Sequence, residues 1–277
     1  MTKEEYCQNE TNEFMKFRNM VINEGSNIIK LVLDDEWFDK TLMDAKEVWL
    51  ENREDFSGKF FPFRWLYEEK QWSFINIGLK QLDSKNPKKE ILRNKLKETI
   101  TENWMHNTCS AFEITSLCKF ELDGILVEIE PRINDTTYKK ADALIRIDKR
   151  ELLIEISSFE TDIELIHAII LNGVRTTLYR DSIDKVKRKI VYKTQYQLSM
   201  ADRPNILLIT LPYDFATTHS AVEIAVSEFL KESISSNVSA IVVFDGYILK
   251  SGRCYFNSKA KYELTDAEKN YFLKVME

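Results

Sequence analysis

The sequence is poor in glycine and lacks the glycine-rich signatures of nucleotide binding. Only 7 of its 277 residues are glycine, and neither GxGxxG nor a GKS or GKT triplet occurs. Rossmann and P-loop sites need such glycines because the backbone must approach the phosphates closely. The GxSxG elbow of α/β-hydrolases is missing as well. The sequence therefore gives no support to these enzyme classes.

Cysteine and histidine are also scarce, which argues against disulfide-rich and zinc-binding folds. The four cysteines are irregularly spaced and form no CxxC motif, and the three histidines form no HxxxH motif. A disulfide framework or a zinc site would need closer, regular spacing of these residues. We expect reduced thiols and structural histidines.

Long apolar runs are absent too. No run approaches the roughly 20 apolar residues that a membrane-spanning helix requires. The first residues, MTKEEYCQNETNEF, are too acidic and polar for a signal peptide. We therefore expect a cytoplasmic protein that is neither secreted nor bound to a membrane.

The acidic charge is concentrated in the N-terminal part. Residues 1–60 hold 8 Lys or Arg against 14 Asp or Glu, which accounts for the whole formal net charge of −6. The sequence pI of about 5.4 argues against a broad surface that coats nucleic acid. The balanced remainder still allows a local basic groove.

The hydrophobic pattern predicts a helical region followed by an α/β region. Apolar residues recur at helical spacing through residues 1–85, and the turn formers around Pro87 suggest a boundary. We expect a helical region over 1–87 and a second domain over 88–277. In the second domain we expect one or two helices over 88–122, and then strands at 125–131, 141–147, 151–157, 206–211 and 240–244, with helices at 163–171, 182–198 and 221–230.

Two of the expected strands form a hairpin that carries one acid each. If the turn centres on Asp148 and Lys149, Asp142 lies opposite Glu155 and Arg146 lies opposite Glu151. Two adjacent carboxylates repel each other unless a cation lies between them or one stays protonated. The pair therefore predicts a site for Mg²⁺ or Mn²⁺, both of which prefer oxygen ligands. The alternative is a solvated strand face with acids placed for solubility.

The order of these acids resembles that of the PD-(D/E)XK nuclease superfamily. The segments concerned are SAFEITSLCKFELDG with Glu113, KKADALIRI with Asp142, LLIEISS with Glu155, and KRKIVYKTQYQL with Lys193 and Gln197 before the buried strand NILLITL. The resemblance covers roughly residues 105–245. It implies a restriction-endonuclease-like αβββαβ core within an α/β fold.

The resemblance also implies metal-dependent cleavage of phosphodiester bonds, with DNA as the expected partner. On this basis Asp142 and Glu155 bind the metal, the carbonyl of Ile156 adds an oxygen ligand, and Glu113 completes the shell or orients a water. Glu113 is equally well explained as an ordinary helix glutamate.

Ser157 departs from the family pattern, which has lysine two residues after the third acid. A neutral hydroxyl brings no positive charge, and losing a transition-state donor typically costs about 10²–10³ in rate. A relocated lysine would compensate. Lys193, on one helical stripe with Lys189 and Gln197, is our first candidate. The other candidates are Lys139 and Lys140, which lie just before Asp142 in the sequence.

The basic run before Lys193 is a candidate phosphate-binding surface. Five of the nine residues 185–193 are basic and none is acidic, a balance unusual for a mixed-sign solvated face. The candidate nucleic-acid contacts are Lys185, Lys187, Arg188 and Lys189. An ordinary exposed helix face is the alternative.

Two functions from different classes follow from the sequence. The first is a metal-dependent nuclease acting on DNA with a relocated lysine. The second is a nuclease-like fold that has lost catalysis and binds nucleic acid or protein, which Ser157 and the acidic N-terminal residues favour. Fold resemblance alone does not decide between them. The N-terminal helical region is a candidate site for a homo-oligomer contact or a protein partner.

Overall fold

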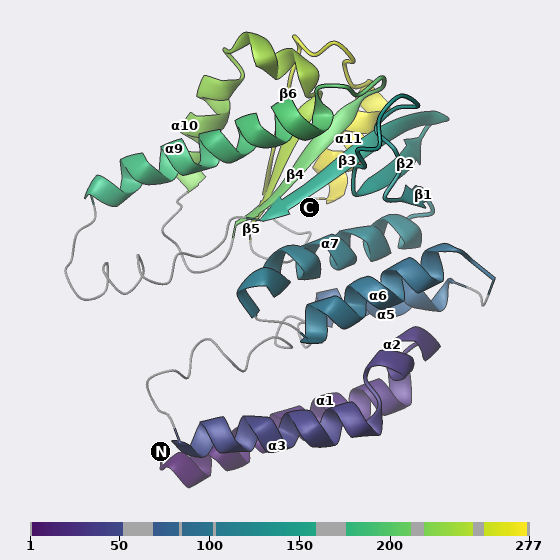
Figure 1. The fold of residues 1–277 in the computed structure, drawn as a ribbon, viewed down its shortest axis with the longest axis vertical. Helices are drawn as coiled ribbons and strands as arrows, with labels where there is room; N and C mark the ends of the chain where they lie inside the picture. The colour runs from purple at the N-terminus through teal and green to yellow at the C-terminus, as the bar shows by residue number, and fades with distance from the viewer. Residues whose placement is uncertain are drawn as a thin grey trace. The chain divides into compact units, whose positions relative to one another are not determined.

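The computed structural model describes residues 2–51, 69–82, 85–101, 104–158, 176–211, 219–245 and 252–275. The chain divides into two compact units, residues 1–122 and 123–277. The first is helical, and the second is a six-stranded mixed sheet interleaved with helices (Figure 1). Among the described residues, no helix is long and apolar enough to cross a membrane.

The helical unit confirms the expected helical N-terminal region. Its described helices are α1 (Lys3–Glu24), α2 (Asn27–Val32), α3 (Asp35–Glu51), α5 (Glu69–Lys80), α6 (Lys88–Thr101) and α7 (Trp104–Leu122). Thr2 and Glu5 form a capping box that starts α1. The core of the unit contains Phe17 and Phe38, whose rings meet edge to face. Gly78 on α5 lies against Cys118 on α7, where a Cβ would come 2.6 Å from the Cys118 carbonyl oxygen.

The division between the two units falls at residue 122, whereas the sequence favours a boundary at residue 87. Helix α7 packs on both α5 and α6, and α2 packs on α6. This packing places α6 and α7 with the first unit. Pro87 thus lies in a turn between two helices of the first unit, and the predicted domain limits of 1–87 and 88–277 remain a prediction.

The second unit contains the expected strands in a single sheet. The strands lie side by side in chain order: β1 (Leu126–Ile129), β2 (Ala143–Ile147), β3 (Arg150–Ser158), β4 (Asn205–Leu211), β5 (Ala240–Asp245) and β6 (Gly252–Phe256). The pairs β3–β4 and β4–β5 are parallel and the others are antiparallel. A parallel pair needs a crossover, and helices α9 (Thr176–Lys193) and α10 (His219–Phe229) lie in the connections after β3 and β4.

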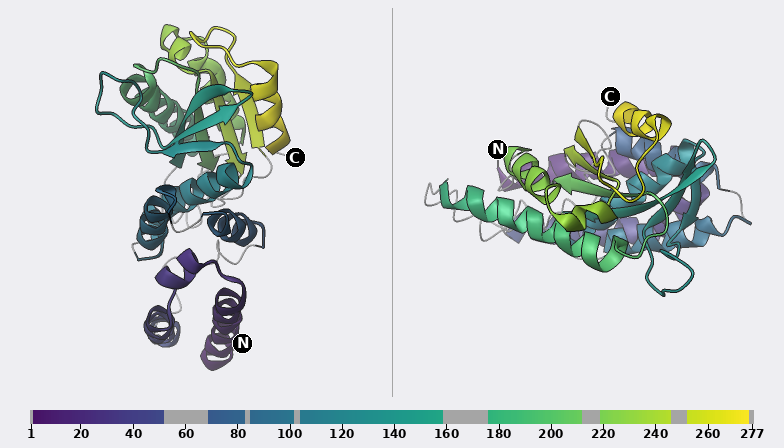
Figure 2. Two further views of the ribbon diagram at one scale, coloured as in Figure 1. Left: turned by 90° about the vertical axis from the view of Figure 1, so that its right-hand side faces the viewer. Right: turned by 90° about the horizontal axis from the view of Figure 1, so that it is seen from above.

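Helices cover both faces of the sheet. Figure 2 shows α9 and α11 (Asp266–Val275) on opposite sides of the strands. The core under α9 and α10 includes Val186 and Ile190 of α9 together with Leu207 and Ile209 of β4. Because side chains alternate along a strand, the residues of β3 in register with Leu207 and Ile209 share this face.

The described elements differ from the expected ones in α9 and at the C-terminal end of the sheet region. Helix α9 begins at Thr176, six residues earlier than expected, and continues as a π-helix over Thr194–Leu198. Strand β6 and helix α11 are additional to the elements that the sequence predicts. The expected helix at 163–171 lies outside the described residues.

Candidate functional site

The β2–β3 hairpin has the predicted turn and register. Asp148 and Lys149 have φ values of +47° and +70°, as a two-residue type I′ turn requires. Leu144 pairs with Leu153, and Arg146 pairs with Glu151. These two side chains form an ion pair at 2.6 Å. The turn therefore sets the register of the acid-bearing strands.

Asp142 differs from the expectation in how it reaches β3. The ladder ends at Ala143 and Ile154, one pair short of Asp142 and Glu155. Instead, the backbone N–H of Asp142 donates to the Ile154 carbonyl, and its carboxylate Oδ2 accepts from the Ile156 N–H at 2.5 Å. The Asp142 side chain thus continues the hydrogen bonding to β3 beyond the last backbone pair of the ladder. This contact gives Asp142 a structural role and holds its carboxylate beside β3.

Glu155 lies on the sheet face that α9 covers. It pairs in register with Leu207, and its exposed fraction is 2%. A buried carboxylate is costly without a charge partner or hydrogen bonds. Lys193 Nζ of α9 lies 2.7 Å from Glu155 Oε1. The buried acid is therefore matched by a cation from a residue 38 positions later in the chain.

The stripe of α9 that includes Lys193 faces β3, as the helical spacing predicts. Lys189, one turn earlier, donates to the carbonyl of Ser158. Lys193 follows with its contact to Glu155, and Gln197 is partly buried one further turn along. Lys189 and Lys193 thus both contact β3, and the catalytic role proposed for a relocated lysine remains a prediction.

The alternative lysines are engaged elsewhere. Lys139 donates to the carbonyl of Tyr196, and Lys140 forms an ion pair with Glu130 at 3.1 Å. The exposed fraction of the Lys193 side chain is 19%, whereas Lys139 and Lys140 are both exposed. Lys193 is therefore the best placed of the three candidate lysines.

Ser157 occupies the predicted position. It is buried, pairs in register with Ile209 and shares the face of Glu155, because the two are separated by one residue on a strand. A lysine at this position would have to extend beneath α9. Ser157, which departs from the family pattern, and Glu155, which Lys193 contacts, thus lie on the same face of the sheet.

Glu113 lies on α7 in the helical unit. Lys95 Nζ of α6 lies 2.6 Å from its Oε1, and both side chains are largely buried. This ion pair links two helices of the same unit, which gives Glu113 a structural role. Its predicted part in a metal site remains a prediction.

The basic residues of α9 lie in three kinds of environment. Lys189 faces β3, whereas Lys187 pairs with Glu228 at 3.3 Å and Glu232 at 2.9 Å. The pKa of Lys187 is raised chiefly by the hydrogen bond to Glu232. Lys185 and Arg188 are exposed. The run therefore stabilises the packing of α9 and leaves two cations at the surface.

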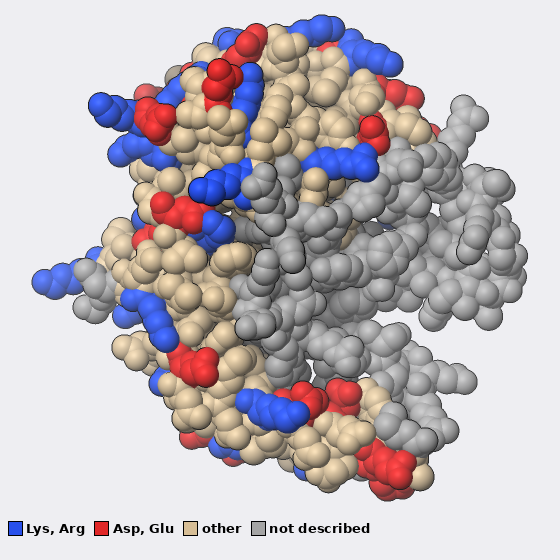
Figure 3. Space-filling view, turned by 180° about the vertical axis from the view of Figure 1, so that it is seen from behind, with Lys and Arg blue, Asp and Glu red and all other residues tan. Residues whose placement is uncertain are grey.

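Basic and acidic side chains are intermixed on one face of the molecule. On the face shown in Figure 3, basic and acidic side chains of the described residues alternate, without a broad area of one sign. Any binding of nucleic acid at this face would have to be local.

The donor set suits a hard divalent cation. Asp142, Glu155 and the carbonyl of Ile156 are oxygen ligands from neighbouring positions of the β2–β3 hairpin, and Mg²⁺ commonly takes one or two carboxylates and keeps several waters. Within the described ranges, no group of three or more His, Cys, Asp or Glu side chains is placed to hold a metal. A site here would thus rely on water or substrate oxygens in addition to the two acids.

Two tyrosines next to this site are not among the residues that the sequence predicts for it. Tyr192 and Tyr196 are both more than half exposed, and their ring centroids lie 4.9 Å apart. Their i, i+4 spacing beside the basic run was the signal that could have identified them.

The chain matches none of the protein-family models, curated proteins or solved structures with which it was compared.

Proposed function

We propose that the chain is a metal-dependent phosphodiesterase that cleaves DNA, with Lys193 in place of the lysine that its third motif lacks. The observation that carries the proposal is the 2.7 Å contact between Lys193 Nζ and the buried Glu155. This contact brings a cation to the part of the hairpin that carries both acids. This is the arrangement that the relocated-lysine hypothesis requires.

The order of elements supports the finer fold assignment. Along the chain, α7 is followed by β1, β2 and β3, then by α9 and β4. The antiparallel β1–β2–β3 meander and the parallel β4 agree with a restriction-endonuclease-like αβββαβ core. Asp142 lies directly before β2 and Glu155 lies in the second half of β3, as that core would require.

Each residue has a chemical role in this proposal. Asp142, Glu155 and the carbonyl of Ile156 would hold Mg²⁺ or Mn²⁺, which supplies an activated water and neutralises charge on the phosphate. Asp142 is already oriented by the N–H of Ile156. Lys193 adds a positive charge beside the acids, so that a phosphate oxygen can be bound there.

The π-helix that begins directly after Lys193 also supports a functional site. Single turns of π-helix are rare and occur frequently at functional sites. Here the turn covers Thr194–Leu198 and includes Gln197. The carbonyl of Tyr196 accepts a hydrogen bond from Lys139, in the segment that leads to Asp142. The π-helical turn thus links Lys193 to the loop before Asp142.

The second candidate function is a binding module without catalysis. The same ion pair can serve only to neutralise Glu155, and the contact with Ile156 can serve only to complete the sheet. Ser157 lacks the charge of a motif lysine. In that case both acids are structural, and the domain binds nucleic acid or a protein partner.

A cleavage assay with matched variants separates the two functions. We expect purified protein to cut plasmid or single-stranded DNA with Mg²⁺ or Mn²⁺, and Asp142→Asn and Glu155→Gln to abolish cutting and calorimetric Mn²⁺ binding. Lys193→Met should lower the rate by about 10²–10³. Ser157→Lys in the Lys193→Met background should restore part of it, whereas the exposed control Lys231→Ala should cut normally.

Melting curves of each variant establish that it is folded. If the folded wild type binds no Mn²⁺ and cuts neither DNA nor RNA, the nuclease proposal is wrong. Retained binding of nucleic acid under those conditions would favour the binding module.

A further inference from the structure

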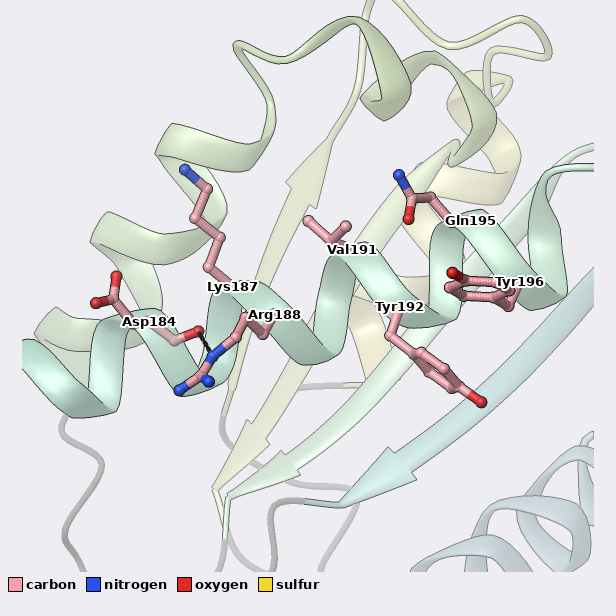
Figure 4. Close-up of a pocket in the computed structure, with 7 residues that line it drawn as sticks. All are labelled: Asp184, Lys187, Arg188, Val191, Tyr192, Gln195 and Tyr196. Atoms are coloured by element: carbon pink, nitrogen blue, oxygen red, sulfur yellow. Dashed lines mark hydrogen bonds between the residues drawn. The ribbon is translucent and has the colours of Figure 1, made fainter.

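The exposed tyrosines lie in a groove that the nuclease proposal does not use. A groove of about 680 Å³ runs along α9 and the π-helix, with Tyr192, Tyr196 and Arg188 among its lining residues. Figure 4 shows Lys187 extending toward α10, while Arg188 and Tyr192 extend away from it. The ring planes of the tyrosines are tilted by 37°, and their exposed fractions are 57% and 55%. Two large aromatic side chains are thus presented side by side to solvent.

The charge around the groove is suited to a polyanion. Lys185 and Arg188 are exposed, and Arg188 precedes Tyr192 by one helical turn. The lining includes one acid, Asp184, whose backbone carbonyl accepts from Arg188 Nε. Aromatic faces beside exposed cations are the combination that binds single-stranded nucleic acid, because bases stack on the rings while cations contact phosphates.

The tyrosines that line the groove are close in the structure to residues of the candidate site. Tyr192 directly precedes Lys193, which contacts Glu155. The carbonyl of Tyr196 accepts from Lys139, three residues before Asp142. Ligand bound on the tyrosines would therefore lie on the helix that brings Lys193 to the acids.

We propose that Tyr192 and Tyr196 form a stacking platform for the bases of single-stranded DNA, with Arg188 on a phosphate. Bases within a duplex are already stacked and cannot lie on these rings, so single strands or unpaired ends are the favoured ligands. The proposal deepens the proposed function by naming its substrate form. It rests on that function only for the claim that the bound strand is cleaved.

The test is fluorescence anisotropy with labelled oligothymidine and with a duplex, in EDTA so that no cleavage takes place. We expect the wild type to bind the single strand more tightly than the duplex. Tyr192→Ala/Tyr196→Ala should weaken binding roughly tenfold for each ring removed. Tyr192→Phe/Tyr196→Phe keeps both rings and should bind like the wild type. Arg188→Ala should reduce the slope of log K against log salt by about 0.7, as loss of one phosphate contact predicts.

The control is Tyr138→Ala, since Tyr138 is 92% exposed but lies in the loop between β1 and β2. Unchanged binding by the double alanine variant, preference for the duplex, or no binding by the wild type would each overturn the inference. So would self-association that depends on the tyrosines, because it would make the groove an interface between copies. If DNA is cleaved while the double alanine variant binds normally, only the platform is wrong. If the platform binds DNA that is never cleaved with metal, only the nuclease is wrong.

Discussion

At the scale of single residues, the ion pair between Lys193 and Glu155 is the central contact of the candidate site. Glu155 is almost completely buried, and Lys193 is mostly buried. Replacing such a pair by apolar residues can be neutral, but removing one partner leaves a buried charge uncompensated. The pair is therefore expected to contribute to stability whether or not the protein is an enzyme.

This expectation gives a stability prediction for Lys193. Lys193→Met removes the ammonium that faces the Glu155 carboxylate and should lower the free energy of unfolding by about 3 kcal/mol. Glu155→Gln in the same background should recover part of the loss, so a double-mutant cycle in urea should show coupling above about 1 kcal/mol. The exposed control Lys231→Ala should stay within about 0.5 kcal/mol. Additive effects of the two substitutions would show that the contact contributes nothing to stability.

At the scale of elements, the β2–β3 hairpin positions both acids through its turn. The turn places two non-glycine residues, Asp148 and Lys149, at positive φ. The left-handed region costs an ordinary residue roughly 1–2 kcal/mol, and glycine avoids this cost. The hairpin register is thus maintained against some local backbone strain.

Lys149→Gly is therefore expected to stabilise the protein by about 1 kcal/mol, measured by urea unfolding. Lys149→Ala is the matched control. It removes the same side chain but keeps the Cβ at φ +70°, so it should bring no gain. A destabilising Lys149→Gly would show that the lysine side chain, and not the backbone, matters at this turn.

At the scale of the whole molecule, the chain consists of two compact units that meet in sequence at residue 122. The helical unit has its own buried core, which includes Phe17, Phe38 and Ile75. Helix α7 packs on α5 and α6 within it. The acidic residues 1–60 belong to this unit, which remains the candidate site for an oligomer or partner contact.

Fragment melting tests this division against the boundary that the sequence suggests. A fragment of residues 1–122 should show helical circular dichroism and a cooperative melt, because it keeps α6 and α7. A fragment of residues 1–87 should melt broadly, because α2 and α5 lose the helices on which they pack. An equally cooperative melt of the shorter fragment would instead support the boundary at residue 87.

The local features of this protein follow from its sequence. Apolar periodicity predicts the N-terminal helices and most strands, and the Asp148-Lys149 turn predicts the hairpin register, because these depend on neighbouring residues. The sequence predicts neither strand β6, whose short GRCYF segment has no clear alternation, nor helix α11. The tertiary structure alone decided that Lys193, and not Lys139 or Lys140, reaches Glu155. It also decided that Asp142 bonds to Ile156 and that Tyr192 and Tyr196 face solvent. These outcomes depend on how α9 packs on a sheet built from distant segments, and no local pattern encodes that packing.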